Sequence, residues 1–395
     1  MFAAPLRRAG AAPSGDGAGR RSLRERWAGL RNRLLTSRAF QNWAAAFPLT
    51  RPIARARSRA LFDVMAGFIY TQTLTACLQT GLLRALGAGA LSISEVANAT
   101  GLEKSVAERL LRAAAGLQLT ERFEGRGEDR YGLGVLGAAF AANPSLEAMA
   151  RHHRALYEDL RDPAALLKGE VPAPRLASYW SYAANPDAAE AQPDEIADYT
   201  ALMADTQAMI AEEVLAAYPL ARHQSLLDIG GGAGAFAAAA AARAPHLRVS
   251  TFDLPAVAAK AAERFAAAGL ADRAEAFGGD FFRDSLPGGR DLVTFVRILH
   301  DHDDGPALAL LRQARAAMEE GACLLIAEPM SDTPGAEPSG DTYFGFYLRA
   351  MGSGRTRRPS ELRQMLHTAG FSDVRLRPTR LPLLTRVLTA RAAAR

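Results

Sequence analysis

The spacing of apolar side chains in the first part of the chain predicts helices followed by a short hairpin. An apolar helical period without proline runs from Leu61 to Leu86. A second helix is expected to start at Ser92 or Ser94, whose hydroxyl can cap it, and a third runs from Lys104 to Leu117. Two short strands then flank a turn at 124–128, so the order is helix, turn, helix, hairpin. That order predicts a winged helix.

The second half of the chain alternates short apolar runs with alanine-rich helices. Residues 144–222 are expected to be mostly helical, with a proline-rich break at 171–174. The alternation after residue 223 predicts an α/β fold with a doubly wound parallel sheet, whose last two strands can form an antiparallel pair. The expected strands are 225–229, 248–252, 274–277, 291–298, 322–327 and 373–378, with another near 384–389.

The length of 395 residues favours two domains with extensions. The expected division is a basic arm at 1–59, a winged-helix-like domain at 60–150, connecting helices at 151–222 and the α/β domain at 223–395.

The basic residues are concentrated in the arm. Residues 1–60 hold thirteen arginines against two acids, a net charge of +11, so the rest of the chain sums to −6. Two interpretations stay open. Such an arm can bind a polyanionic surface, nucleic acid or anionic lipid, and Trp27, Leu30, Leu34 and Leu35 among the arginines favour lipid. The alternative is a solvated, poorly ordered tail, since residues 9–19 are almost entirely Ala, Gly, Pro and Ser.

Two cysteines, Cys77 and Cys323, lie far apart in apolar runs, which argues against a disulfide framework and for a reducing compartment. The chain has no run of eighteen uncharged apolar residues and no apolar stretch typical of a signal peptide. We therefore expect a cytoplasmic protein without a membrane span.

A glycine-rich loop follows the first strand of the α/β domain. Its pattern is Asp228-x-Gly230-x-Gly232-x-Gly234. Glycines there permit positive φ angles and close approach of a ligand to the backbone. Dinucleotide enzymes carry Gly-x-Gly-x-x-Gly instead. The tighter spacing favours a cofactor without a pyrophosphate.

Two more acids follow strands at the same sheet edge. Asp253 lies about twenty residues past the loop, where an acid can bind both ribose hydroxyls. Asp280 can accept a hydrogen bond from an adenine amino group while Phe281 packs on the ring. The alternatives are a helix cap before Pro255 for Asp253 and a turn for Asp280. Taken in order, the three features predict an S-adenosylmethionine-dependent methyltransferase.

The segment from His300 to Asp304 carries two imidazoles and three carboxylates. A metal site and helix capping by the aspartates are alternatives, and we expect no metal. His300 is the preferred candidate for a general base, because removing a hydroxyl proton as the O–C bond forms lowers the barrier to methyl transfer. Such a base needs an orienting acceptor, and Glu328 at the end of the next strand is placed to supply it.

Taken together, the winged-helix half, the glycine loop, Gly-Asp-Phe-Phe, Leu-His-Asp and Ala-Glu-Pro resemble the small-molecule O-methyltransferases related to plant caffeate and flavonoid enzymes. The resemblance covers about residues 60–390 and implies a Rossmann-like catalytic domain with an N-terminal winged-helix dimerisation domain. It implies a homodimer, His300 as proton acceptor with Glu328, and cofactor binding by Asp253, with its neighbour Leu254, and by Asp280.

The chain departs from that family at two positions. Val296 stands where the family often has Lys, and Arg297 is expected to point to the opposite face of the strand. The family's second orienting Glu, expected around 352–355, is absent, which leaves Glu328 alone or with Glu337 or Asp341.

A narrower resemblance joins three segments, 40–52, 300–304 and 343–354, to bacterial carotenoid O-methyltransferases of the hydroxyneurosporene and demethylspheroidene type. It implies methylation of the tertiary hydroxyl of an acyclic carotenoid, an apolar substrate that suits a basic arm at a membrane surface. Side chains expected to line an apolar channel are Phe344, Tyr347 and Met351, although helix core is an equal alternative for them.

Two other functions remain as alternatives. The same chemistry could act on a phenol or a polyketide, since function lies in the pocket and not in the fold. A DNA-binding regulator would use the winged helix, but the helix from Lys104 to Leu117 is close to neutral, whereas a helix facing phosphates is expected to be basic. We therefore expect no nucleic-acid partner.

Overall fold

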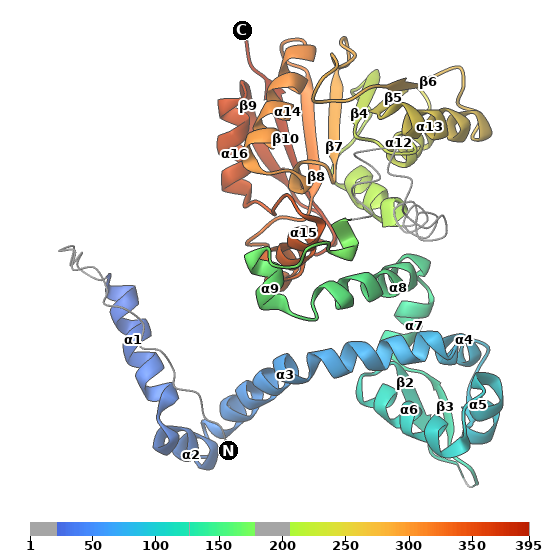
Figure 1. Ribbon diagram of the computed structural model, residues 1–395, viewed down its shortest axis with the longest axis vertical. Coiled ribbons are helices and arrows are strands. Elements are labelled where there is room, and N and C mark those ends of the chain that lie inside the picture. The colour runs from blue at the N-terminus through green and yellow to red at the C-terminus, as the bar shows by residue number, and fades with distance from the viewer. Residues whose placement is uncertain (1–21, 126, 178–205, 395) are drawn as a thin grey trace. The chain divides into compact units, whose positions relative to one another are not determined.

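The computed structural model describes residues 22–125, 127–177 and 206–394, and the chain divides into two compact units, Met1–Ala76 and Cys77–Arg395. The first unit contains α1 (Leu23–Thr36), α2 (Arg38–Ala46) and most of α3 (Arg51–Gln79) (Figure 1). A capping box between Ser22 and Glu25 starts α1. The expectation of a poorly ordered tail is therefore wrong for residues 22–46, while residues 9–19 lie outside the described part.

Helix α3 begins ten residues before the expected start at Leu61, because the proline at 52 falls in its first turn, where a helix tolerates it. Contrary to expectation, α3 has the length and apolarity of a membrane-crossing helix, and only 6% of its apolar window is buried. A count of uncharged residues misses this window because Asp63 lies within it. Core helices and signal sequences meet the same criterion, so length and composition alone do not establish a span.

The second unit opens with the expected winged helix. Its three strands pair antiparallel in the order β1-β3-β2. Ser92, and not Ser94, caps the first of its two central helices through a capping box with Glu95. A left-handed Gly81 interrupts the long helix expected over 61–86. The elements are α4 (Leu82–Leu86), β1 (Leu91–Ser92), α5 (Ile93–Thr100), α6 (Lys104–Gly116), β2 (Thr120–Phe123) and β3 (Arg130–Leu133).

Helices connect the winged helix to the sheet, as expected. They are α7 (Val135–Ala141), α8 (Pro144–Asp159) and α9 (Pro163–Lys168), with a further helical stretch at residues 206–217. The expected helix from Ile196 to Tyr218 is described only from residue 206, and the polar loop near 185–186 lies outside the described residues.

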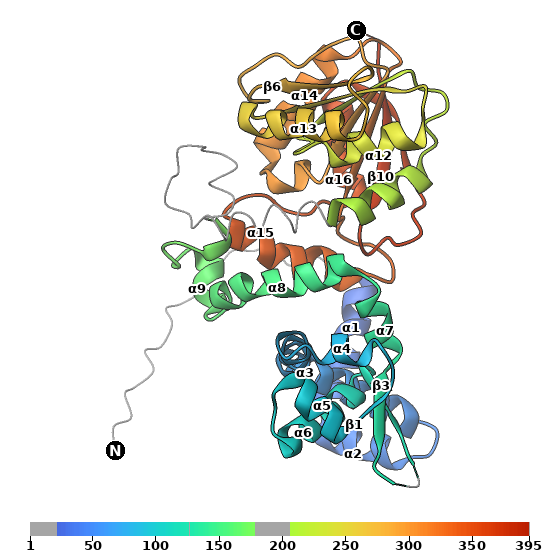
Figure 2. The same cartoon turned by 90° about the vertical axis from the view of Figure 1, so that its right-hand side faces the viewer.

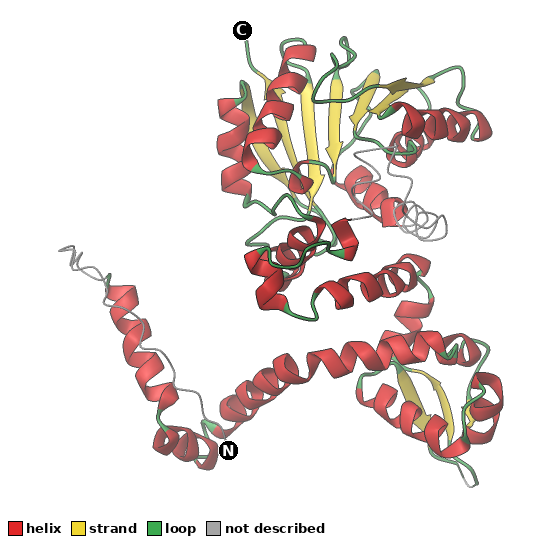
Figure 3. Cartoon of the chain, in the orientation of Figure 1, coloured by secondary structure: helices red, strands yellow, loops and turns green. Residues whose placement is uncertain are grey.

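The α/β domain contains a seven-stranded sheet in the order β6-β5-β4-β7-β8-β10-β9 (Figure 3). The five strands from β6 to β8 run parallel, and β10 is antiparallel to both its neighbours. The doubly wound sheet with an antiparallel C-terminal pair is confirmed. Its strands are β4 (Ser225–Ile229), β5 (Arg248–Asp253), β6 (Ala274–Gly278), β7 (Leu292–Val296), β8 (Cys323–Glu328), β9 (Phe371–Arg377) and β10 (Arg386–Ala392).

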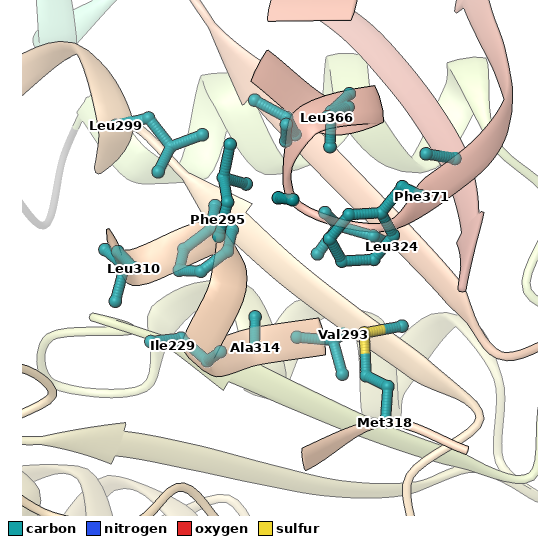
Figure 4. Close-up of a cluster of buried hydrophobic side chains, with 14 of the residues drawn as sticks. Ile229, Val293, Phe295, Leu299, Leu310, Ala314, Met318, Leu324, Leu366 and Phe371 are labelled. Atoms are coloured by element: carbon teal, nitrogen blue, oxygen red, sulfur yellow. The ribbon is translucent and has the colours of Figure 1, made fainter. Parts of the chain in front are cut away.

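Helices cover both faces of this sheet (Figure 2). On one face, α12 (Ala235–Arg243), α13 (Pro255–Ala267) and the helix at 206–217 pack against β4 and β5. On the other, α14 (Asp304–Ala317) and α16 (Pro359–Thr368) pack against β7 and β8. Figure 4 shows this second core, where Phe295 and Leu324 from the strands meet Leu310 and Leu366 from the helices. Apolar burial on both faces holds the carboxyl edge of the sheet in place.

Candidate functional site

The carboxyl ends of the parallel strands bring the predicted site residues to one edge of the sheet. The glycine loop follows β4, Asp253 ends β5, and Asp253 pairs in register with Gly278 at the end of β6. Glu328 ends β8 two strands away from β4 on the other side. Ligands of open α/β sheets bind at this edge.

The backbone of the glycine loop is left-handed at three positions, with φ of +70° at Gly230, +57° at Gly232 and +74° at Gly234. A Cβ at Gly230 would lie 2.5 Å from Ile298, and one at Gly234 would lie 2.8 Å from Phe265. A Cβ at Gly232 would meet no atom within 4 Å. Packing therefore requires two of these glycines, whereas Gly232 faces open space and can be approached by a ligand.

Asp228 lies beneath the loop. Its side chain is buried, Oδ1 accepts from the Thr294 hydroxyl at 2.7 Å, and Oδ2 is buried without a hydrogen-bond partner. Burial, which outweighs the Thr294 hydrogen bond, raises the pKa of Asp228 to about 7. Because a Cβ at Gly231 would lie 2.6 Å from Oδ2, the carboxyl group supports the loop from its inner side.

Asp253 fixes the same loop from the next strand. Its Oδ2 accepts from the backbone N–H of Gly232 and its Oδ1 from that of Leu254, each at 2.8 Å. The alternative role as a helix cap does not hold, since the N-cap of α13 is Leu254 and no side chain caps it. Burial raises the pKa of Asp253 against these two hydrogen bonds. Each oxygen retains capacity to accept another donor.

Asp280 and Phe281 follow β6. The carboxylate of Asp280 accepts from the backbone N–H of Phe282 at 2.8 Å, so the turn role expected as an alternative is present. The Phe281 ring lies edge-on to the ring of His302, with 5.7 Å between centroids. The side chains of Asp280 and Phe281 are only partly buried.

His300 was expected at the end of a strand. It lies instead on a short 3-10 helix, Leu299–Asp301. β7 stops at Val296 because Arg297 adopts a left-handed backbone with φ of +59°. Because Arg297 lies outside the strand, the alternation of side chains along a strand does not apply to it. The prediction that its side chain points to the opposite face from Val296 therefore loses its basis. Its guanidinium contacts Thr206, with Nη1 3.3 Å from Oγ1.

The buried imidazole of His300 lies between two carboxylates. Nε2 is 3.0 Å from Oδ1 of Asp301, and Nδ1 is 3.6 Å from Oε2 of Glu328. The same Glu328 oxygen accepts from the backbone N–H of His300 at 3.0 Å. Burial, the largest influence, raises the pKa of Glu328. Glu328 thus fixes the backbone of His300 by a hydrogen bond, and its carboxylate lies near Nδ1, which makes no hydrogen bond within the described residues.

The other acids proposed from the sequence have partners elsewhere. Glu337 accepts from the backbone N–H of Gly335 at 3.1 Å, and Asp341 accepts from the Ser331 hydroxyl at 2.7 Å. The second carboxylate at His300 is instead Asp301, its neighbour in sequence. Sequence reasoning assigned Asp301 to helix capping, and only the Leu-His-Asp motif itself could have indicated a role at the imidazole.

A fully buried arginine anchors the loop that carries His300. Arg357 donates to the carbonyls of Leu299 at 2.8 Å and His302 at 2.7 Å, and to the carboxylate of Asp304 at 2.9 Å. These bonds fix the backbone on both sides of His300. No motif in the sequence marked Arg357.

His302 was weighed as a metal ligand with His300. Its ring stands edge-on to Phe282, with 5.1 Å between centroids, and burial lowers its pKa. Within residues 22–125, 127–177 and 206–394, no three His, Cys, Asp or Glu side chains gather as they would around a metal ion.

Aromatic side chains lie next to the catalytic candidate. The ring of Phe344 is 5.9 Å from that of His300, centroid to centroid. Phe344 ends a π-helix, Pro338–Phe344, and continues into α15 (Gly345–Met351), whose Tyr347 and Met351 are buried. These residues pack with Leu156 of α8, so they form part of a helical core, which was the alternative expected from the sequence.

Two histidines of α8 make this wall partly polar, which the sequence did not indicate. Nε2 of His152 lies 3.0 Å from the Tyr347 hydroxyl, and Nε2 of His153 lies 2.8 Å from that of Tyr343. Burial, helped by the charges of His153 and Arg297, lowers the pKa of His152 to about 4. Both pairs are therefore neutral near pH 7.

Comparison with known proteins identifies the family of this chain. Residues 158–372 match the family described as O-methyltransferase domain, and residues 62–143 match the O-methyltransferase dimerisation domain. Demethylspheroidene O-methyltransferase of Cereibacter sphaeroides is 39% identical over 91% of this chain and 93% of its own length. The protein of the same name from Rhodobacter capsulatus is 38% identical over 87% and 84%.

Solved structures agree with the fold. The S-adenosylmethionine-dependent methyltransferase SibL is 27% identical with a TM-score of 0.70, covering 85% of this chain and 99% of its own. Human N-acetylserotonin methyltransferase in complex with SAM has a TM-score of 0.70 at 23% identity, over 86% and 98%. The expected Rossmann-like sheet with an N-terminal dimerisation domain is confirmed, and S-adenosylmethionine is the cofactor. The chain belongs to the S-adenosylmethionine-dependent O-methyltransferase family.

Proposed function

We propose that this enzyme methylates the tertiary hydroxyl of an acyclic 1-hydroxy carotenoid, with His300 as general base. The observation that carries the substrate assignment is the 39% identity, over nearly the whole chain, to a demethylspheroidene O-methyltransferase. Phe344 lies beside His300 and packs in one apolar cluster with Tyr347 and Met351, a lining that suits a long apolar substrate. We assign these three residues to the substrate pocket.

The proton chemistry follows from the two carboxylates at His300. When bound, S-adenosylmethionine supplies an electrophilic methyl group, which a hydroxyl oxygen attacks in line. The carboxylate of Glu328, 3.6 Å from Nδ1, favours a proton on that nitrogen, so Nε2 can take the hydroxyl proton once the substrate hydroxyl has displaced Asp301 from it. The carboxylate of Asp301 beside Nε2 then stabilises the imidazolium that results. Among these groups, His300 is the proton acceptor and Glu328 the orienting residue.

The proposed cofactor site is the glycine loop with the acids beside it. The fit rests on the open space in front of Gly232 and on the remaining acceptor capacity of Asp253. We assign Gly230, Gly232, Gly234, Asp253, Leu254, Asp280 and Phe281 to cofactor binding. Asp228 belongs with them as a residue that acts through the loop, because its carboxyl group is buried beneath Gly231.

The proposed organisation keeps the division drawn from the sequence, with an arm at 1–59, a dimerisation domain at 60–150, connecting helices at 151–222 and a catalytic domain at 223–395. A homodimer formed through the dimerisation domain is the proposed assembly. A carotenoid is dissolved in a bilayer, so we place the enzyme in the cytoplasm, peripherally at the inner face of the photosynthetic membrane.

Incubation with methyl-labelled S-adenosylmethionine tests the substrate. The full chain is given extracted 1-hydroxy carotenoids in detergent, and simple phenols in parallel reactions. We expect label in the carotenoid methyl ether. Label only in phenols would reject the carotenoid and favour the second candidate, a phenolic or polyketide substrate. That candidate draws on the polar pairs His152–Tyr347 and His153–Tyr343 in the wall.

A further inference from the structure

Helix α1 carries a narrow apolar stripe that faces solvent. The stripe consists of Leu23, Trp27, Leu30 and Leu34, which fall on one line of an α-helix at spacings of four, three and four. Their exposed fractions are 74%, 70%, 50% and 47%, respectively. No residue of α1 is buried. A helix in water gains nothing from such a stripe unless another apolar phase covers it.

Arginines border this stripe on both sides. At 100° per residue, Arg24 and Arg31 lie along one flank and Arg26 and Arg33 along the other. Glu25, with Asn32, falls on the opposite face. Arginine stems can bury along apolar surface while the charged heads reach outward to phosphates. This distribution is typical of a helix lying in the plane of a bilayer surface.

Helix α2 adds an aromatic face of the same kind. The ring of Trp43 lies between two others. Its centroid is 5.7 Å from that of Phe40 and 5.2 Å from that of Phe47. Trp43 is 52% exposed and Phe47 40% exposed. Ser37 ends α1 and caps α2, so the two helices are joined end to end (Figure 1). Tryptophan side chains favour the boundary between lipid and water.

Charge decides between the candidate occupants. Residues 22–59 contain nine arginines and one acid, a net charge of +8. A symmetric contact with the same segment of a second copy would bring two such charges together. Nucleic acid would neutralise the arginines but leave the apolar stripe uncovered. An anionic lipid surface would neutralise the arginines and cover the apolar stripe at the same time.

We propose that α1 and α2 form a peripheral anchor that binds bilayers containing anionic lipid. The stripe of α1 and the aromatic face of α2 enter the headgroup region, and the flanking arginines contact lipid phosphates. The anchor lies outside the matched dimerisation domain, which begins at residue 62, and outside the matched catalytic domain. Its purpose, access to a membrane-dissolved substrate, rests on the proposed function, whereas the binding itself does not.

Vesicle sedimentation with the full chain tests the anchor. One set of vesicles is phosphatidylcholine alone, and the other contains about one third phosphatidylglycerol. We expect binding to the anionic set, which falls steeply as salt is raised, and a blue shift of tryptophan fluorescence on binding. Arg24→Gln/Arg31→Gln should weaken binding about tenfold or more, since each arginine contributes about 1 kcal/mol near such a surface. Trp27→Ser/Leu30→Ser should abolish most of the binding and, in proportion, most of the fluorescence shift, since Trp43 remains in the anchor.

The matched control is Arg312→Gln/Arg363→Gln, which removes the same charge from exposed positions of α14 and α16. Equal weakening by control and anchor variants, or equal binding to both sets of vesicles, would overturn the proposal. A second possible outcome is that the unaltered chain does not bind vesicles and that the anchor variants lose the dimer in light scattering. That result would show that a second copy covers this face instead. Methylation of detergent-dissolved carotenoid should survive in the anchor variants. If the unaltered chain binds vesicles but does not methylate the carotenoid, the proposed substrate fails and the anchor stands.

Discussion

Nε2 of His300 lies 3.0 Å from Oδ1 of Asp301, the carboxylate of the next residue in the chain. That approach is attractive only when Nε2 carries a proton, because a lone pair would face a negative oxygen. With Glu328 near Nδ1, the pocket is complementary to a doubly protonated ring. The site is therefore complementary to the imidazolium that forms once His300 has taken the substrate proton. Before that step, the substrate hydroxyl has to displace the Asp301 carboxylate from Nε2.

Replacement of Asp301 by Asn tests this relationship. Asn keeps the size of the side chain but removes the charge, so the imidazolium loses its stabilising partner at Nε2. We expect kcat to fall by about 10- to 100-fold, less than the roughly 10²- to 10⁴-fold that a general base itself contributes, because His300 is still present. The dissociation constant for S-adenosylmethionine, measured by calorimetry, should stay unchanged. An unaltered kcat would mean that Asp301 leaves the imidazole before the proton moves.

Replacement of His300 by Ala should separate two classes of acceptor. A tertiary alcohol is far less acidic than a phenol and depends more on the base, so its methylation should fall by about 10³-fold or more. A phenol should retain a measurable fraction of its rate. Initial rates with both acceptors check this, and substantial residual methylation of the carotenoid would reject His300 as the base.

The fold was predictable because its signals are local and repeated. Alternating apolar strands and helices fixed the strands of the sheet within a few residues, and the glycine spacing placed the loop after β4. Ser92 was one of two serines predicted to cap the following helix, and the structure shows it in a capping box. Such features need no knowledge of distant contacts.

The details around His300 were not predictable, because they depend on residues far apart in sequence. The left-handed Arg297 ends β7 early, and no propensity marks an arginine for that backbone. Arg357 reaches back more than fifty residues to the carbonyl of Leu299. The pairs that His152 and His153 make with tyrosines of α15 and the π-helix likewise arise only from packing.

Acid should destabilise the enzyme through His152. Burial lowers its pKa from about 6.5 to about 4 in the folded state, so the unfolded chain binds more protons between these values. The stability that comes from keeping His152 neutral is therefore present above pH 6.5 and lost as the pH falls toward 4, by at most about 3 kcal/mol. Thermal unfolding from pH 7 to 4.5 should show a smaller decline for His152→Gln.

Asp228 has the opposite sign, since its pKa is raised to about 7 and its contribution to stability is lost as the pH rises through that value. Asp228 is present in the unaltered enzyme and in His152→Gln, so its effect on stability cancels when the two are compared. Parallel curves for the two proteins would show that His152 is not the group responsible.

Gly232 and Gly234 offer a matched pair for the cofactor loop. Both have positive φ, so alanine costs about 1 kcal/mol of backbone strain at either position. At Gly234 the new Cβ also meets the Phe265 ring at 2.8 Å, and we expect a clear loss of thermal stability. At Gly232 the Cβ enters the space proposed for the cofactor, so Gly232→Ala should bind S-adenosylmethionine more than tenfold more weakly with little change in melting temperature. Equal cofactor binding by Gly232→Ala and the unaltered enzyme would place the cofactor elsewhere.

Arg357 and Arg355 both bind the carboxylate of Asp304, but only Arg357 is buried and only Arg357 donates to the carbonyls that flank His300. Arg357→Leu should leave those carbonyls without their donor, with a loss of about 2–4 kcal/mol in the free energy of unfolding, since a buried acceptor left unpaired costs about 1–3 kcal/mol. Arg355→Leu removes a half-exposed partner and should cost less than about 1 kcal/mol. Denaturant titration compares the two. At a temperature where both variants stay folded, kcat should fall only for Arg357→Leu, because only that variant frees the backbone carrying His300. A similar loss of kcat in both would assign the anchoring of the loop to Asp304 rather than to Arg357.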